Sequence, residues 1–246
     1  MKKIYSILIL LWIAIPIQAQ ETIQHDPTNT WFTLFNRVKI NKKWSFSNEL
    51  HERLGGFLSK QSTFLERASI DYHLKDNVEI SLGYSFLSNR IPLSDTNLKI
   101  NTYENNIWEQ ILLKHKISTV DILHRFRQEH RWFDVLAKGS NENFNKDGVN
   151  FANRFRYRLT MVLPLKTFGN KKVVFLQAFD EIWLPQTDNL MPKSFSRNWF
   201  YLGVGYKFNS NTNLQLGYMS EWNVIATDTY KSKPIIQTTF VKSFTL

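Results

Sequence analysis

Two stretches of the sequence place arginine at every second position, a spacing that could bind carboxylate or phosphate groups. One is HRFRQEHR at residues 124–131, and the other is NRFRYRL at residues 153–159. A guanidinium group grips a carboxylate or a phosphate through two parallel hydrogen bonds, so a cluster of them attracts anions. The residues that would form such a cluster are Arg125, Arg127, Glu129, Arg131, Arg154, Arg156 and Arg158.

Every second side chain of a β-strand lies on the same face, so we expect strands to position these arginines. Eleven segments alternate between apolar and polar residues, and they cover residues 31–40, 44–54, 63–74, 78–88, 103–113, 119–132, 150–163, 173–184, 197–208, 213–222 and 235–246. Their lengths match tilted membrane-crossing strands better than the shorter strands of soluble sheets. The chain is therefore predicted to be all-β.

The connections between these segments alternate between short and long. The short ones cover residues 41–43, 75–77, 114–118, 165–172 and 209–212, and the long ones cover residues 55–62, 88–102, 133–149, 185–196 and 223–234. Short periplasmic turns and longer external loops are typical of bacterial outer-membrane barrels. Residues 20–246 are therefore predicted to form one domain, a single antiparallel transmembrane β-barrel.

The expected number of strands follows from where the chain ends. A last strand that descends from an external loop ends in the periplasm, and an odd number of strands would leave the start of the barrel outside. We therefore expect a twelfth, short strand between Glu21 and Thr30, broken by Pro27, which restores the even number of bacterial barrels. Ten strands is the alternative.

Two segments have an ambiguous pattern. Residues 103–113 place Glu104 and Trp108 on one face and Ile107, Glu109 and Ile111 on the other, and residues 173–184 are nearly as ambiguous. A β-bulge, which changes the facing partway along a strand, would explain both. Three glycines of late strands alternate with aromatic residues, and we expect a bulky neighbour to pack there or the wall to bend. They are Gly203, Gly205 and Gly217.

The N-terminus has the three parts of a secretory signal: Lys2 and Lys3, an apolar stretch at residues 4–15, and a small-residue exit that ends at Ala19. The apolar stretch is shorter than the roughly 20 residues that a membrane-spanning helix needs. Residues 1–19 are therefore predicted to be a cleaved signal peptide. Export and the barrel pattern together predict a location in the bacterial outer membrane.

Composition narrows the possible functions. The chain has no cysteine, which excludes a disulfide framework, thiolate metal ligands and a cysteine nucleophile. Its net charge of +10 is spread through apolar segments, and an exported protein does not normally meet nucleic acid. The expected partners are outer-membrane lipid, the phosphates of lipopolysaccharide and a small anionic solute, which the positive charge would attract. We expect the protein to be a monomer.

A charge on the lipid-facing side of a barrel costs about 2 to 4 kcal/mol near the bilayer centre, so the clustered arginines are expected to face the interior. There they could attract a small anion for passage or binding. Alternatively, Glu129 and other inward acids, such as Glu49 and Glu79, could neutralise them and fill a closed structural barrel. The sequence leaves both interpretations open.

A lipid-modifying enzyme, such as an acyl hydrolase or acyltransferase, is a third hypothesis. His51 shares a strand face with Ser45 and Ser47, while His124 and His130 fall on the outward face. None of the short motifs of serine hydrolases or zinc enzymes occurs in the sequence. Cationic residues lie among the neighbouring glutamate and histidine residues and would repel a metal ion. We therefore predict no catalytic residue, no metal site and no cofactor.

Several phrases of the sequence resemble the DUF2490 family of uncharacterised Gram-negative outer-membrane β-barrel proteins. They are WSFSNELHER at residues 44–53, LHRFRQEHR at 123–131, NRFRYRL at 153–159, FDE at 179–181, RNWFYLGVGYK at 197–207 and LGYM at 216–219. The resemblance covers nearly the whole mature chain and implies an outer-membrane barrel. It supplies no catalytic residue, because the function of the family is itself unknown.

Overall fold

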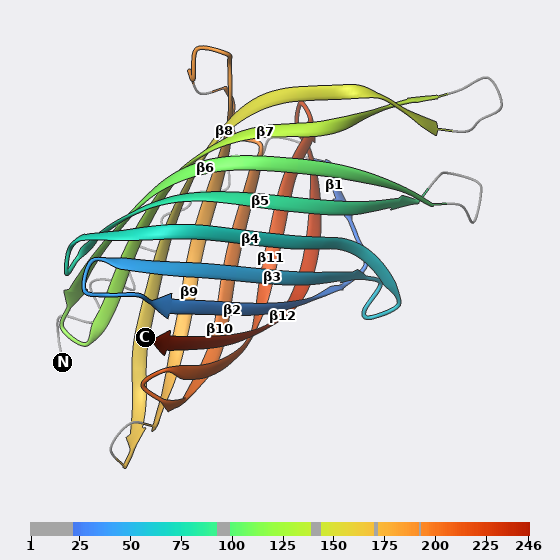
Figure 1. Cartoon of the computed structure of the whole chain (residues 1–246). Coiled ribbons are helices and arrows are strands. Elements are labelled where there is room, and N and C mark those ends of the chain that lie inside the picture. Colours follow the sequence, from blue (N-terminus) through green and yellow to red (C-terminus); the bar gives the residue numbers. More distant parts are fainter. Residues whose placement is uncertain (1–21, 93–98, 139–143, 170–171, 192) are drawn as a thin grey trace.

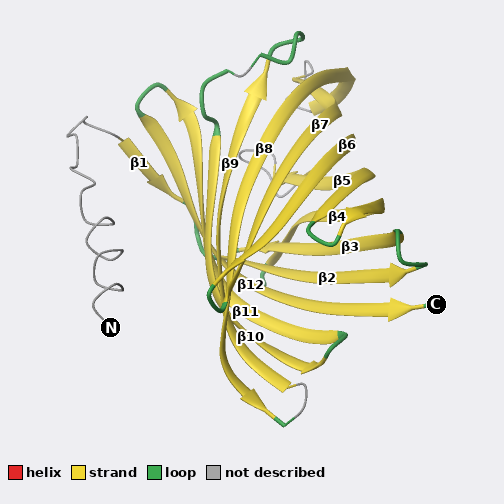
Figure 2. Ribbon diagram, turned by 90° about the vertical axis from the view of Figure 1, so that its left-hand side faces the viewer, coloured by secondary structure: helices red, strands yellow, loops and turns green. Residues whose placement is uncertain are grey.

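The computed structural model describes residues 22–92, 99–138, 144–169, 172–191 and 193–246. The predicted signal peptide, residues 1–19, lies outside them. The described residues form β-strands joined by turns and loops, as Figure 2 shows, so the all-β prediction is confirmed. No helix in this described part is long and apolar enough to cross a membrane.

The alternating sequence builds twelve strands. Their bounds are β1 (Thr22–His25), β2 (Asn29–Lys39), β3 (Trp44–Gly55), β4 (Lys60–Lys75), β5 (Val78–Pro92), β6 (Lys99–Ile117), β7 (Val120–Lys138), β8 (Phe144–Phe168), β9 (Lys172–Gln186), β10 (Arg197–Asn209), β11 (Thr212–Ala226) and β12 (Thr229–Thr245). The eleven alternating segments correspond to β2–β12, and the short strand expected between Glu21 and Thr30 corresponds to β1, which ends before Pro27.

Strands β2–β12 form a closed barrel of eleven strands, in which all neighbours are antiparallel except at the closing seam. There β12 pairs with β2 in parallel, from Ile235 opposite Asn29 to Thr245 opposite Lys39. Figure 1 shows β12 beside β2, with β9–β11 forming the wall behind. The prediction of an even, wholly antiparallel barrel is therefore wrong, because the first and last strands run in the same direction and an odd number closes the sheet.

Strand β1 does not widen the barrel. It pairs in parallel with the beginning of β12, from Thr22 opposite Thr229 to His25 opposite Ser232. Strand β2 then continues along the same edge of β12, after an interruption that contains Pro27. Proline has a fixed φ and no backbone N–H, so it interrupts strand pairing. The expected short strand exists, but it extends the edge that β2 forms along β12 and does not add a strand to the barrel wall.

Several connections that were expected to be long loops are largely strand. Strand β7 ends at Lys138 and β8 begins at Phe144, and the β11–β12 connection consists of Thr227 and Asp228. The two strands of a hairpin satisfy each other's backbone N–H and C=O groups. A hairpin can therefore extend beyond the barrel wall without other neighbouring strands. Figure 1 shows the β7–β8 hairpin reaching past its neighbours at the end of the barrel opposite the C-terminus. We call this the hairpin end, and the end that holds the C-terminus the turn end.

The outward face of the barrel is mainly apolar. Phe46, Ile70 and Leu82 are successive partners on β3, β4 and β5, and all three are exposed. Similar apolar side chains, among them Phe200 and Leu202 on β10, cover the other side. Exposed apolar side chains around a closed wall are typical of a barrel that is embedded in a membrane.

The bulges expected in residues 103–113 and 173–184 are absent from the described strands β6 and β9, which carry no extra residue. The ambiguous pattern in β6 has another cause. Trp108 points inward and donates a hydrogen bond to Ser85 at 2.9 Å, while Glu109 points outward and lies 3.3 Å from His130. A large ring inside and a charge outside therefore blur the alternation without shifting the register.

One part of the interior is apolar, which the sequence did not predict. Its core cluster is Trp31, Phe179, Trp183, Trp199, Tyr201, Met219 and Ile235. These side chains come from β2 and β9–β12. The ring of Trp199 lies 5.4 Å from that of Trp31 and 4.6 Å from that of Trp183, so the rings form one packed row.

Glycine makes room for these rings. A Cβ atom on Gly217 or Gly203 would lie 2.2 to 2.6 Å from the ring or hydroxyl of Tyr201, and one on Gly205 would lie 2.1 Å from Phe175. All three glycines therefore stand where a bulky side chain packs, as expected from the sequence. The ring comes from the neighbouring strand at Gly205 and Gly217, and from the same strand at Gly203.

Candidate functional site

The structure places all seven predicted lumen residues on the inward faces of β7 and β8. The two strands pair so that Arg125 lies opposite Arg158, and Arg127 opposite Arg156. Like charges directly opposite one another destabilise a sheet unless other groups intervene. The arginine ladders therefore need acidic partners.

One of these partners is Glu129, the predicted acid of the cluster. Its side chain is 1% exposed and accepts hydrogen bonds from Arg154 Nε at 2.7 Å and from Arg156 at 2.6 Å. Arg127 lies farther away, at 3.9 Å. Glu129 therefore neutralises the hairpin end of the ladders.

Glu181 on β9 is the other main acidic partner of the arginine ladders, and the sequence did not indicate this role. It is 0% exposed and accepts hydrogen bonds from Arg156 Nε at 2.8 Å and Arg158 Nε at 2.9 Å, and it also contacts Arg125. Because Arg156 bridges Glu129 and Glu181, the two carboxylates belong to one network.

A third carboxylate faces this network from β3. Glu49 accepts a hydrogen bond from Arg67 at 2.7 Å and contacts His51, whose other ring nitrogen lies 3.0 Å from the hydroxyl of Thr33. Glu49 was expected to neutralise the arginine ladders, but it pairs with Arg67 of β4. Glu79 likewise pairs elsewhere, with Arg37 at 3.0 Å.

We call this level of the barrel interior the charged layer. Side chains of β7–β9 form one ion-pair network there, and the Glu49–Arg67 pair of β3 and β4 borders a small cavity together with Arg127. The members of the charged layer are Glu49, Arg67, Arg125, Arg127, Glu129, Arg154, Arg156, Arg158 and Glu181. Six of the nine are cations and three are anions. Uncompensated buried charge is costly, so the surplus of positive charge favours an additional anion nearby.

The charged layer and the aromatic row together fill the lumen. Arg127 is 4% exposed, donates hydrogen bonds to Gln110 at 2.7 and 3.1 Å, and lies 4.0 Å from the ring of Trp108. Arg156 stacks on Trp183 with its guanidinium carbon 4.0 Å from the ring centre. Through these contacts, arginines of the charged layer pack directly against the aromatic rings of the interior.

A cavity lies on each side of the filled level. One, of about 430 Å³, is at the turn end and is bordered by Lys114, Lys207 and Phe175 among others. The other, of about 280 Å³, lies toward the hairpin end, and we call it the vestibule. The two cavities share no lining residue among those described, and the nearly unexposed side chains of Glu129, Arg156 and Glu181 belong to the filled level.

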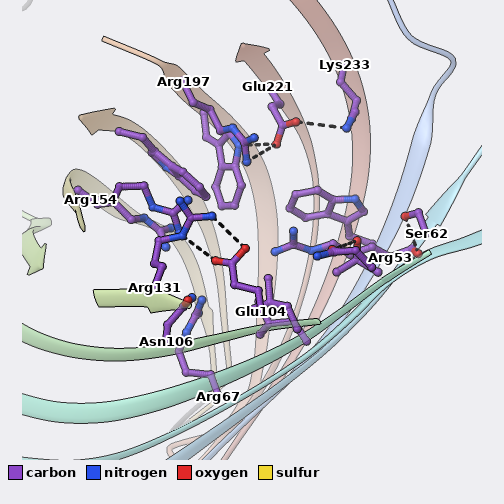
Figure 3. Close-up of a pocket in the computed structure, with 18 of the residues that line it drawn as sticks. Arg53, Ser62, Arg67, Glu104, Asn106, Arg131, Arg154, Arg197, Glu221 and Lys233 are labelled. Atoms are coloured by element: carbon purple, nitrogen blue, oxygen red, sulfur yellow. Dashed lines mark hydrogen bonds and ion pairs between the residues drawn. The ribbon is translucent and has the colours of Figure 1, made fainter. Parts of the chain in front are cut away.

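The vestibule is rich in arginine and tryptophan. Its charged and aromatic lining residues are Arg53, Arg67, Arg131, Arg154, Arg156, Arg197, Lys233, Glu104, Glu221, Trp31, Trp183 and Trp199. Figure 3 shows the guanidinium groups of Arg53, Arg131, Arg154 and Arg197 gathered around this one space. A further cavity of about 500 Å³ shares part of this lining and extends to the β9–β10 loop, so the vestibule opens toward the hairpin end.

Arg131, the last of the predicted residues, lies in the vestibule instead of the charged layer. It forms a two-point hydrogen bond with Glu104, through Nε at 2.6 Å and a terminal nitrogen at 2.9 Å. Arg53 on β3 was missed by the sequence analysis. It stacks on Trp31 at 3.9 Å and makes no ion pair in the described part of the chain, and its buried Nε has no hydrogen-bond partner.

His51 shares the inward face of β3 with Ser45 and Ser47, and His124 and His130 face outward, as expected. The histidine that contacts Ser45 is a different one, His73 of β4. Ser45 lies 2.7 Å from His73 Nε2, whose Nδ1 is 3.4 Å from Glu79. A hydroxyl, an imidazole and a carboxylate in this order can activate a nucleophile. However, Ser45 is only 1% exposed.

The fold and this interior define a class of protein: a closed β-barrel with an apolar outer wall and a charged, filled lumen. Residues 28–231 match the DUF2490 family model, described as a protein of unknown function, and the chain belongs to this family. Among solved structures, the chain is similar to the β domain of the Bordetella autotransporter Brka, at 11% identity and a TM-score of 0.44, with 82% of each chain covered. No curated protein matches the sequence.

Proposed function

We propose that this protein is a monomeric barrel of the bacterial outer membrane that binds a small anionic solute in its vestibule. The apolar outer wall and the charged interior support the membrane location, because this arrangement is the reverse of a soluble barrel. The secretory pattern of residues 1–19 supports export. Outer-membrane lipid and lipopolysaccharide would then surround the wall.

One observation carries the proposed binding role: cations outnumber carboxylates at a buried site that opens to solvent on one side. Arg53 has no acidic partner among the described residues. Arg197 and Lys233 share the carboxylate of Glu221, at 3.9 and 3.3 Å, and Lys233 also lies 3.9 Å from Asp26. An anion that enters from the hairpin end would meet guanidinium groups that are already held in place. Such a ligand would lower the cost of burying their charge.

The closed structural barrel is the second candidate, and the filled charged layer favours it. Both proposals expect the lumen to be impermeable, and they differ only in ligand binding. The passage of a solute through the lumen finds less support, because the charged layer separates the vestibule from the cavity at the turn end.

Planar-bilayer recording tests whether the lumen is closed. We expect the reconstituted protein to give no single-channel current steps in concentrated KCl, because Arg156, Glu129 and Glu181 occupy the middle of the lumen with almost no exposed surface. A large porin reconstituted in the same way serves as the positive control. Regular current steps with anion selectivity would show that the solute passes through.

Calorimetric titration with inorganic phosphate tests the binding role. We expect saturable binding that Arg53→Met weakens about tenfold or more, because a hydrogen bond to a charged group contributes about 1.5 to 3 kcal/mol. Arg90→Met is the matched control, since Arg90 is exposed on β5 and borders none of the described cavities. If phosphate does not bind, or binds equally to both variants, the vestibule is not an anion site and the structural proposal stands.

A further inference from the structure

The vestibule contains buried hydrogen-bonding groups that nothing in the described protein satisfies. Asn106 is 3% exposed and its carbonyl oxygen has no hydrogen-bond partner, and Trp183 is 5% exposed and its indole N–H has none. Both side chains line the cavity, as does Arg53 with its unpartnered Nε. Buried polar groups are nearly always hydrogen-bonded, so these three mark where a ligand would make contacts.

The cationic contacts lie on one part of the lining. Arg131 is already held by Glu104, and Arg154 and Arg156 are held by Glu129. Arg53 is the cation with the fewest partners, and Trp199 links it to the β10–β11 wall: its ring lies 5.8 Å from the Arg53 guanidinium and its N–H donates to Glu221. An anionic group would therefore be held beside Arg53.

The two uncharged groups of the vestibule, on Asn106 and Trp183, require a second kind of group on the ligand. The Asn106 carbonyl oxygen accepts a hydrogen bond, and a carboxylate or sulfate has no hydrogen to donate to it. A hydroxyl group can either donate to the Asn106 carbonyl oxygen or accept from the Trp183 N–H, so a ligand with several hydroxyls can satisfy both groups. A simple anion would leave the amide unsatisfied, which carries a cost of its own.

Size and access limit the ligand further. The vestibule holds about 280 Å³, and the lining side chains point into the barrel from its wall. Liquid water takes up about 30 Å³ per molecule, so the space corresponds to roughly nine waters. The three tryptophans supply apolar surface between the polar groups. A small, free solute with a carbon skeleton fits this lining better than a bare ion.

We propose that the vestibule selects small hydroxylated anions, the class that contains sugar acids and sugar phosphates, over simple anions and over neutral sugars. The anionic group binds at Arg53, and hydroxyl groups bind at Asn106 and at Trp183. This inference rests on the proposed anion-binding function and names its ligand class.

Calorimetry on the full-length protein in detergent micelles tests the inference with three probes that separate the two kinds of group. Glucuronate carries a carboxylate and hydroxyls, acetate carries only the carboxylate, and glucose carries only hydroxyls. We expect glucuronate to bind about tenfold or more tightly than acetate, and glucose to bind most weakly. Asn106→Leu should bring glucuronate to the affinity of acetate and leave acetate unchanged, whereas Asn105→Leu, on the adjacent outward position, should change neither.

Trp183→Phe provides a second variant in case Asn106→Leu fails to fold, because the lost N–H has no partner in the described protein. It should weaken glucuronate severalfold and acetate little. Equal affinities of wild-type protein for glucuronate and acetate, or tight binding of glucose, would overturn the inference and leave the anion site standing. If neither phosphate nor acetate binds, the proposed function itself has failed.

Discussion

Glu181→Gln is expected to lower the free energy of unfolding of the barrel by about 3 to 5 kcal/mol, the usual cost of breaking a buried ion pair. Glu181 has no exposed surface and contacts three arginines of the charged layer, Arg125, Arg156 and Arg158. Glutamine keeps the size and one acceptor oxygen but removes the charge. The six arginines of the layer would then face two carboxylates instead of three.

Urea unfolding of the protein in micelles, followed by tryptophan fluorescence, measures this loss. Glu66→Gln is the matched control, because Glu66 is exposed on the outward face of β4 and its nearest polar contact is Asn48 at 3.5 Å. We expect the control to unfold at nearly the wild-type urea concentration. Equal midpoints for both variants would mean that the charged layer does not hold the barrel together.

A disulfide across the closing seam is expected to form almost completely in Asn36→Cys/Lys242→Cys. The two residues are partners in the parallel pairing of β2 with β12, and both point outward. Neighbouring strands lie about 4.8 Å apart, within the range over which two cysteines can be bridged. The chain has no cysteine of its own, so no other disulfide competes.

Asn36→Cys/Ser232→Cys is the control for this experiment. Ser232 pairs with His25, near the other end of the seam, so the parallel closure keeps it far from Asn36. Migration on a non-reducing gel and mass spectrometry of the linked peptides measure both pairs. A link in the control pair, and none in the test pair, would show that the barrel closes antiparallel.

The sequence by itself determined the strands and the facing of their side chains. Alternation is a local property, because neighbouring side chains of a strand point to opposite faces wherever the strand lies. For this reason the segments from Trp44 to Thr245 matched β3–β12 closely, and Arg127 and Arg156 were expected inside. The same pattern did not distinguish loops from extended hairpins, since polar residues can continue a paired strand beyond a membrane.

Only the tertiary structure decided how the barrel closes and which charges meet. Whether β12 pairs with β2 in parallel depends on how many strands enter the closed wall, because an odd number of strands, each antiparallel to the one before, leaves the first and last strands parallel. No local pattern shows that β1 stays outside this count. Which carboxylates pair with the arginine ladders depends on distances across the lumen. Glu181 pairs with Arg156 of the ladders, whereas Glu49, which was expected to pair with them, pairs with Arg67. The arginine spacing thus predicted an anion-attracting interior, while packing across the lumen closed its middle and left the vestibule open at one end.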